Sequence, residues 1–361
     1  MRLADVRGHD RVRGILSRAL ERDRLPPALL FAGPDGVGKK LLALAVAQAA
    51  LCERAPVAEP CGECRACRRV SAALAPDRIE ELRQAADRHP DEDVWRNFRL
   101  HPDLVLAEGW WLTKAGRPRP EPEIRVGQVR DLIGEIAGAP FEARRRVFVV
   151  DDAHTMNDAA QNALLKSLEE PPPRSHVILV SSAPVGLRPT IRSRCQRLSF
   201  GPLSRAVVAA LLAERQGVSE EEARGPAALA GGSLGAALAF ESEAYARMRE
   251  GLLDLLERAE TLDPLARLEA AEALERSEDP ALLLTTLRSL LRDLAALRSG
   301  AETRVLLNAD AAPRLAALAG GRLGERATLL AERAEEARLG LRGFANKLLT
   351  FDLLVDSLAG E

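Results

Sequence analysis

Aromatic residues and long apolar runs are both scarce in this 361-residue sequence. Phe, Trp and Tyr make up 3% of it, whereas Ala, Leu, Glu and Arg dominate, a composition that favours helices over sheets. The longest apolar run, LLALAVAQAALC at 41–52, falls well short of the roughly 18 residues that a membrane span needs. The N-terminus MRLADVRGHDRVRG is charged throughout and lacks the apolar core of a targeting segment. We therefore expect a cytoplasmic protein with no membrane contact.

The sequence also lacks an excess of charge of either sign. The sequence has 51 basic and 53 acidic residues, so its net charge of -2 gives no general basic surface for nucleic acid. Any contact with DNA must then come from a local patch or from partners. The three arginines at 144–146 are expected to be surface charge. The length allows two or three domains, each with its own core.

Residues 33–40 read GPDGVGKK, one letter from the phosphate-binding pattern G-x-x-x-x-G-K-S/T. In such a loop, backbone N–H groups wrap a polyphosphate, the lysine neutralises the outer phosphates, and the hydroxyl holds Mg²⁺. Lys40 replaces the hydroxyl and cannot hold a metal ion. A predicted strand at 28–33 and a predicted helix at 41–51 flank the loop, and the helix N-terminus favours anions. The candidate nucleotide-binding residues of this loop are Gly33, Pro34, Gly36, Val37, Gly38, Lys39 and Lys40.

A buried strand at 147–150, VFVV, closes on Asp151 and Asp152. In a nucleotide fold Asp151 would stand beside the metal ion, and Asp152 occupies the position where many ATPases have a water-orienting glutamate. Aspartate is one methylene shorter, which leaves the positioning of water in doubt. A solvated acidic pair at the end of a strand is the weaker interpretation, because the phosphate-binding loop accompanies it.

Strands alternate with helices up to residue 204, which predicts an α/β fold with a parallel sheet covered on both faces. Further strands are predicted at 103–109 and 176–184, and helices at 124–140 and 156–170, the latter capped by Thr155 or Asn157. Residues 76–99 lack strong periodicity and are interpreted as an insertion or a mobile excursion. The segment 110–123 is rich in proline and charge and is predicted to be an exposed loop. After 204 the pattern is helical only.

Four of the five cysteines form the pattern C-x₈-C-x₂-C-x₂-C, and they are Cys52, Cys61, Cys64 and Cys67. Four thiolates are typical of a closed structural zinc site with no open position for catalysis, although an iron–sulfur cluster also takes four. A reducing compartment disfavours disulfides. Cys195 is expected to be a small buried residue, and His89 and His101 are weaker candidates as substitute ligands.

The stretch RPTIRSRCQRL places four arginines within ten residues, namely Arg188, Arg192, Arg194 and Arg197. Such a run is commonly a solvated face. An arginine at this end of a nucleotide domain could instead reach a neighbouring subunit's γ-phosphate and stabilise transition-state charge. The residues alone leave the two interpretations open.

The motifs GPDGVGKK, the cysteine cluster, HPDL, AAQNALLKSLEEPP and TIRSRC occur in an order and at spacings that resemble the bacterial clamp-loader family of DNA polymerase III, most closely its delta-prime branch. The resemblance covers roughly 1–240 and is weak beyond. It implies an AAA+ domain at 1–204 with a zinc-binding insertion at about 52–67, a helical lid at 205–240, and a helical collar at 241–361. It further implies a hetero-pentameric ring with gamma/tau and delta subunits, acting through the complex on a sliding clamp and primer-template DNA. The arginine that such subunits give in trans to an adjacent ATP site corresponds to Arg194.

Several departures from the motor subunits of this family accompany the resemblance. Motor subunits have Ser or Thr where Lys40 stands, DE where Asp151 and Asp152 stand, and a sensor arginine where GGSLGAA places Gly235 or Ala236. We therefore expect a stator with little or no binding of ATP or ADP and no ATP hydrolysis of its own. An ATP-hydrolysing gamma/tau-like motor is the alternative, and a P-loop nucleotide kinase, which would explain neither the cysteines nor LEEPP, ranks far behind.

Overall fold

The computed structural model describes residues 2–112, 118–239, 243–277, 279–342 and 346–360. The chain divides into two compact units, Met1–Leu203 and Ser204–Glu361. Among the described helices, none has the length and apolar character needed to cross a bilayer.

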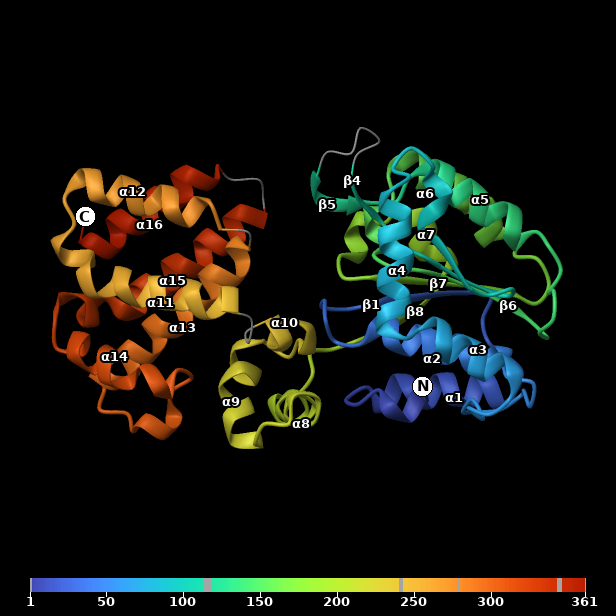
Figure 1. The fold of residues 1–361 in the computed structure, drawn as a ribbon, viewed down its shortest axis with the longest axis horizontal. Helices are drawn as coiled ribbons and strands as arrows, with labels where there is room; N and C mark the ends of the chain where they lie inside the picture. Colours follow the sequence, from blue (N-terminus) through green and yellow to red (C-terminus); the bar gives the residue numbers. More distant parts are fainter. Residues whose placement is uncertain (1, 113–117, 240–242, 278, 343–345, 361) are drawn as a thin grey trace. The chain divides into compact units, whose positions relative to one another are not determined.

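The first unit is built on a six-stranded sheet with the order β2-β3-β6-β7-β1-β8 (Figure 1). Five of these strands run parallel, and only the edge strand β2 pairs antiparallel with β3. The strands of this sheet are β1 Ala28–Ala32, β2 Asn97–His101, β3 Leu104–Ala107, β6 Arg146–Val150, β7 Ser175–Ser181 and β8 Gln196–Ser199. The predicted α/β fold with a parallel sheet is confirmed.

Helices cover both faces of this sheet (Figure 1), as a parallel sheet requires. Every residue of β1, β6 and β7 is buried, which explains why these strands are nearly continuous apolar runs in the sequence. The helices and helical turns of the unit are η1 Leu3–Asp5, α1 Asp10–Glu21, α2 Lys39–Leu51, α3 Arg65–Ala73, α4 Pro76–Asp87, η2 Asp93–Arg96, α5 Val126–Ile136, η3 Ala153–Thr155, α6 Asp158–Glu169, η4 Pro184–Gly186 and α7 Pro189–Arg194. At the start of α6, Asn157 Oδ1 accepts the Ala160 N–H at 2.9 Å, so the Asn157 alternative for the helix cap is confirmed.

The carboxyl ends of the parallel strands bring several polar segments to one edge of the sheet. The loop 33–38 follows β1, Asp151 follows β6, and Glu108 follows β3. Strand β7 lies between β1 and β6, so a side chain from the loop must reach past one strand to meet Asp151. Ligands of open α/β sheets bind at this edge, and the candidate site is therefore built here.

Two segments differ from their predicted structure. Residues 76–99, predicted to be irregular or mobile, contain helix α4, the turn η2 and the start of β2. Only Ala86 of α4 is buried, and a helix with so small an apolar face leaves a weak periodic signal. The predicted loop 110–123 contains a two-stranded ribbon of β4 Trp110–Leu112 and β5 Pro118–Glu123, while 113–117 lie outside the described residues. Proline is tolerated in such an edge strand, where a missing N–H costs no central ladder bond.

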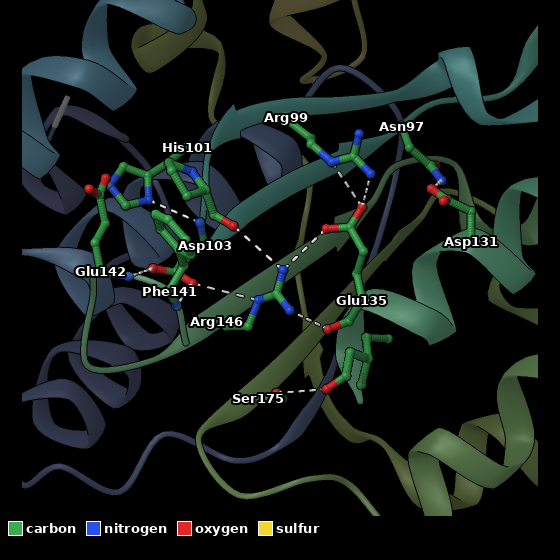
Figure 2. A network of polar contacts seen from close by, with 12 residues as sticks. Asn97, Arg99, His101, Asp103, Asp131, Glu135, Phe141, Glu142, Arg146 and Ser175 are labelled. Carbon is green, nitrogen blue, oxygen red and sulfur yellow. Dashed lines mark hydrogen bonds and ion pairs between the residues drawn. The ribbon is translucent and has the colours of Figure 1, made fainter. Parts of the chain in front are cut away.

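A polar network at the opposite, amino edge of the sheet fixes the loop that leads into β6 (Figure 2). The buried Asp103 carboxylate accepts the N–H groups of Phe141, Glu142 and Ala143 at 2.6, 2.9 and 2.8 Å. Arg146 lies 3.6 Å from Asp103 and 3.2 Å from Glu135, measured between charged atoms. The expectation that the arginines at 144–146 are surface charge is therefore wrong for Arg146, which is 9% exposed because it bridges two carboxylates.

In the second unit the regular structure of the described residues consists of helices and helical turns. Its helices are α8 Arg205–Gln216, α9 Glu220–Leu229, α10 Leu234–Ala239, α11 Glu243–Arg258, α12 Pro264–Glu275, α13 Pro280–Arg298, α14 Ala312–Ala319, α15 Arg322–Arg342 and α16 Lys347–Ala359. Helix α13 carries a buried leucine stripe at helical spacing, Leu283, Leu287, Leu290 and Leu294, which anchors the core. The predicted boundary between lid and collar, 240/241, falls outside the described residues.

Candidate functional site

The backbone of the loop 33–38 has the form that its glycines permit. Gly36 and Gly38 have φ values of +67° and +97°, which other residues rarely adopt, and Gly38 caps α2. A Cβ atom on Gly33 would lie 2.2 Å from the Phe200 carbonyl oxygen, so no larger residue fits. The sequence analysis did not single out His9. Its Nε2 lies 2.8 Å from the Val37 carbonyl oxygen, so this side chain supports the loop. The loop therefore retains the form of a phosphate cradle.

Lys39, the lysine of the phosphate-binding pattern, is directed back at its own loop. It is 4% exposed, and its Nζ donates to the Pro34 carbonyl oxygen at 2.5 Å. Burial lowers the pKa of Lys39, while the carboxylates of Asp35, Asp152 and Asp151 oppose this shift. The ammonium thus bonds to a neutral main-chain oxygen, and a phosphate oxygen, which is itself charged, would be a stronger acceptor.

Lys40 reaches past β7 to the acidic residues that follow β6 and β3. Its Nζ lies 2.9 Å from Asp151 Oδ2 and donates to Glu108 Oε1. Arg83 of α4 holds the same carboxylate, with Nε 2.9 Å from Glu108 Oε2 and Nη2 2.9 Å from Oε1. Two cations and two carboxylates therefore alternate in one cluster, Arg83, Glu108, Lys40 and Asp151, which we call the Lys40 cluster. It lines a cavity of about 100 Å³ together with Gly109, Pro122 and Asp152.

Opposite charges within the Lys40 cluster favour the charged forms of Glu108 and Lys40. Burial would raise the pKa of Glu108, but Arg83 and Lys40 outweigh it and hold this pKa at about 2. Burial would lower the pKa of Lys40, yet Asp151 and Glu108 raise it above its ordinary value. Glu108 and Arg83 were missed by the sequence analysis. A carboxylate at the end of the predicted strand 103–109 was the one signal for Glu108, and nothing local indicated Arg83.

The residues at Asp151 do not suit a magnesium ion. Mg²⁺ demands oxygen ligands at about 2.0–2.1 Å in octahedral arrangement. Here the Asp151 carboxylate already lies 2.9 Å from the ammonium of Lys40. Lys40 also stands at the position where the phosphate-binding pattern has its hydroxyl residue. A divalent ion beside it would meet direct repulsion in a partly buried place.

Asp152 lies next to this cluster in a left-handed backbone conformation, with φ of +45°. Burial, together with the carboxylates of Asp151 and Asp35, raises the pKa of Asp152 to about 6. Its carboxyl group therefore titrates close to neutral pH. A group of this kind can accept a proton from water, provided that a water molecule and a γ-phosphate are correctly placed.

The four clustered cysteines converge, as the spacing predicts. The sulfur atoms of Cys52, Cys61, Cys64 and Cys67 all lie within 4.8 Å of one another. Two of the separations, Cys61 to Cys67 and Cys52 to Cys64, are 4.0 Å. Four sulfurs at about 2.3 Å from a central zinc ion would be about 3.8 Å apart, so the two 4.0 Å separations are close to those around such an ion.

Main-chain N–H groups point at two of the sulfur atoms in this cysteine cluster, and they favour the thiolate of Cys61. The Cys64 N–H points to Cys61 Sγ at 3.3 Å, and the Cys67 N–H points to Cys64 Sγ at 3.4 Å. Bonds from the N–H groups of Cys64 and Glu63 lower the pKa of the Cys61 thiol to about 6. A thiolate is the form that binds metal, and the cluster could therefore hold a metal ion.

The remaining candidates for metal ligands lie elsewhere. Cys195 is buried in the hydrophobic core, and burial raises its pKa to about 12. His101 accepts the Asp103 N–H through Nδ1, and its Nε2 lies 3.0 Å from Glu142. His89 Nδ1 lies 3.6 Å from Glu92. Within the described residues, the cluster of possible metal ligands contains cysteines alone.

Arg194 ends helix α7 and is held by a carboxylate from the neighbouring helix α6. Its Nη2 lies 2.5 Å from Glu169 Oε1, and its Nη1 donates to the Thr190 carbonyl oxygen at 2.9 Å. The Arg194 side chain remains 33% exposed. Glu169 belongs to the LEEPP motif, which the sequence analysis noted without giving this residue a role. Arg188 pairs instead with Asp158, at 3.4 Å.

The parallel sheet, the glycine loop after β1 and the acidic pair after β6 define the class as a P-loop nucleotide-binding fold. The family described as "DNA polymerase III, delta subunit" matches residues 8–204, more than half of the chain. The chain therefore belongs to this family of AAA+ clamp-loader proteins.

Individual relatives come from several branches of DNA polymerase III proteins. The gamma/tau subunit of Mycobacterium tuberculosis is 33% identical over 368 residues, covering 94% of this chain and 57% of that protein. The delta' subunit of Pseudomonas aeruginosa is 39% identical over 168 residues, covering 46% and 41%. Among solved structures, a gamma subunit-related protein of Thermotoga maritima aligns at 16% identity with a TM-score of 0.36, covering 96% of this chain and 98% of that one. The chain spans between about a quarter and three fifths of the length of the curated relatives it matches.

Proposed function

We propose that this chain is a stator subunit of the DNA polymerase III clamp loader, of the delta-prime type. In this role it helps load the sliding clamp onto primed DNA, and it completes the ATP site of an adjacent motor subunit without hydrolysing ATP itself. The observation that carries the proposal is the ammonium of Lys40, which lies 2.9 Å from Asp151, where a motor subunit needs a metal ion.

Loss of the metal removes the chief electrostatic contribution to phosphoryl transfer. The metal ion of a P-loop ATPase bridges the β- and γ-phosphates and neutralises the charge that develops on them. An ammonium at the same place carries one charge instead of two and cannot hold the phosphates in octahedral geometry. Asp152 adds to the deficit, because its carboxylate is one methylene shorter than the usual glutamate. We therefore propose that the glycine loop keeps the form of a phosphate-binding loop but has no hydrolytic activity.

Arg194 is the group that we propose this chain supplies to its neighbour. It stands at the end of α7, remains one-third exposed, and has its guanidinium fixed by Glu169 at 2.5 Å. A planar guanidinium is well suited to transition-state charge on a phosphoryl group, and it stays charged at all relevant pH values. Glu169 is proposed to hold this side chain in position before Arg194 contacts the neighbour's nucleotide.

The four cysteines are proposed to hold a structural zinc ion. When bound, that ion would join the segment before α3 to the end of α2, because Cys52 follows α2 and Cys67 lies in α3. Four thiolates fill a tetrahedral shell and leave no open position, so no catalytic role is assigned to the metal.

The partners follow from family membership. We propose a hetero-pentameric ring with gamma/tau and delta subunits, in which residues 205–240 form the lid and residues 241–361 form the collar. The sliding clamp and primer-template DNA would be met through the assembled complex.

A gamma/tau-like motor is the second candidate. It is favoured by the 33% identity to the M. tuberculosis gamma/tau subunit across 94% of this chain. The pKa of about 6 for Asp152 also suits a group that accepts a proton from water.

ATP hydrolysis by the isolated chain separates the two candidates. We expect the wild-type chain to release phosphate no faster than a Lys39→Ala variant, since neither holds the required metal ion. Turnover by the wild type that Lys39→Ala abolishes would establish the motor, because a contaminating ATPase would not respond to that substitution.

A further inference from the structure

The four clustered cysteines differ in their access to solvent. Cys61 and Cys64 are partly exposed, whereas Cys52 and Cys67 are buried. The two sulfur separations of 4.0 Å each join a partly exposed cysteine to a buried one, Cys61 to Cys67 and Cys64 to Cys52. A small oxidant can therefore reach one thiol of each pair, and a second thiol lies beside it. An accessible cysteine next to a resolving cysteine is the arrangement of a redox-sensitive site.

The chain around Cys61 and Cys64 allows these pairs to close. A disulfide has an S–S length of about 2.05 Å, so the sulfurs of each pair must approach by about 2 Å. Cys61 precedes α3 in an irregular segment, and nothing lies within 4 Å of the place that a Cβ on Gly62 would take. Cys64 is the N-cap residue of α3, outside the regular helix. The two partly exposed sulfurs can thus move toward their buried partners without breaking a helix or a strand.

We propose that the cysteine cluster is a peroxide-sensitive modification site, in which oxidation joins Cys61 to Cys67 and Cys52 to Cys64 and expels the metal ion. In each pair the partly exposed thiolate attacks a peroxide oxygen, so that an S–O bond forms, the O–O bond breaks and hydroxide leaves. The buried thiolate then attacks the sulfur of this sulfenic acid, so that the S–S bond forms, the S–O bond breaks and a second hydroxide leaves. Each pair thereby gives two electrons to one peroxide molecule, and its sulfurs are no longer thiolate ligands.

The inference rests on the zinc site of the proposed function and deepens it, because it assigns that site a change of state. A reducing compartment keeps the four sulfurs as thiolates, so the change occurs only where peroxide acts faster than the reductants. A dithiol can afterwards reduce both disulfides by exchange, which makes the modification reversible.

The loop between the first two cysteines gives the oxidation a structural consequence. This loop carries Glu59, whose carboxylate accepts the N–H groups of Leu3 and Ala4 at 2.7 and 3.1 Å. Leu3 is fully buried and begins the turn η1, which precedes α1. Because closing the disulfides moves Cys61, and with it one end of this loop, we expect Glu59 to lose its contacts with η1.

The test is stepwise oxidation of the full-length chain, purified with zinc, by hydrogen peroxide. We expect about two peroxide molecules per chain to release all of the zinc and to lower the mass of the metal-free chain by about 4 Da, because four thiol hydrogens are lost. Peptide mapping without reduction should find the two proposed disulfides, and hydrogen exchange should become faster at 2–6 but not at 147–150. Dithiothreitol with added zinc should restore the starting mass and zinc content. Cys195→Ala is the matched control, since its thiol is buried in the core of the sheet, and it should respond as the wild type does.

Three results would overturn the proposal. They are peroxide treatment that leaves the zinc bound, disulfides that join Cys61 to Cys64 or one chain to another, and oxidation to sulfinic acids without any disulfide. Cys67→Ser tests the resolving role, because Cys61 should then stay a sulfenic acid that dimedone traps. The wild-type map needs no variant, so a Cys67→Ser chain that fails to fold leaves the test intact. A chain purified without zinc from zinc-replete cells would contradict the metal site and its release step, while the map would still decide the pairing, and neither result bears on the ATP hydrolysis that tests the stator.

Discussion

The substitution Glu108→Gln removes the shared partner of Lys40 and Arg83 while keeping the size of the side chain. In the folded chain this carboxylate accepts hydrogen bonds from Nε and Nη2 of Arg83, each at 2.9 Å, and one from Lys40. A glutamine can still accept through its one oxygen, but its NH₂ group must then face a donor. We therefore expect the free energy of unfolding of the first unit to fall.

The magnitude follows from the pKa of Glu108. A decrease from its ordinary value of 4.5 to about 2 corresponds to about 3 kcal/mol, because one pKa unit is worth about 1.4 kcal/mol. Removing one partner of a buried ion pair costs about 3–5 kcal/mol, which agrees in size. Since Lys40 retains Asp151, we expect a loss of about 2–4 kcal/mol at pH 7. This stabilisation is complete above pH 4.5 and is lost as the pH falls toward 2, because the folded pKa lies below the unfolded one.

Tryptophan fluorescence during urea unfolding reports on the first structural unit, because all three tryptophans fall within residues 1–203. They are Trp95, Trp110 and Trp111. Glu81→Gln is the matched control, since its partner Arg78 and Glu81 itself are 57% and 64% exposed and such surface pairs contribute about 1 kcal/mol or less. A loss for Glu108→Gln no larger than that of the control would refute the reasoning about the Lys40 cluster.

Two further predictions concern Asp152 and the cysteine cluster. Because the folded pKa of Asp152 is about 6 and its ordinary value is 3.8, its contribution to stability decreases as the pH rises through 6. Asp152→Asn, which tolerates the same left-handed backbone, should thus raise the melting temperature at pH 8 more than at pH 5, and equal effects would count against this assignment. If the cysteines hold the proposed zinc ion, its removal by a chelator should increase hydrogen exchange at 52–67 without unfolding the sheet, and global unfolding would contradict a modular metal site. Elemental analysis should find zinc in Cys195→Ala but none in Cys61→Ser.

The parts of the fold that the sequence predicted are those with local signals. Residues 147–150 form a strand buried on both faces, and such a strand reads as a continuous apolar run. Asn157 caps its helix through an N–H three residues away, so its role needs no tertiary information. Helix α4 was missed because it buries only Ala86, and burial of an apolar face is what creates a periodic pattern.

The candidate site divides in the same way. The glycine loop and the cysteine cluster are each contained in a short segment, and their spacing was sufficient to find them. The partners of Lys40 come from the fold, since Glu108 lies 68 residues away in sequence. Arg83, which holds Glu108, belongs to a different helix, α4. Glu169 reaches Arg194 in the same manner, from the end of a different helix. Sequence reasoning therefore found that Lys40 was unusual, whereas the structure identified what holds it.

The most direct test of the stator account is ATP hydrolysis by a clamp loader reconstituted with its motor subunits, sliding clamp and primed DNA. Arg194→Ala in this chain is compared with Arg197→Ala, an exposed arginine three residues further along. The account predicts that Arg194→Ala abolishes most of the turnover at the site it serves, where a guanidinium is worth about 10³-fold or more, while Arg197→Ala leaves the rate close to that of the wild type. Equal rates for the two variants would contradict the claim that this chain completes a neighbour's active site.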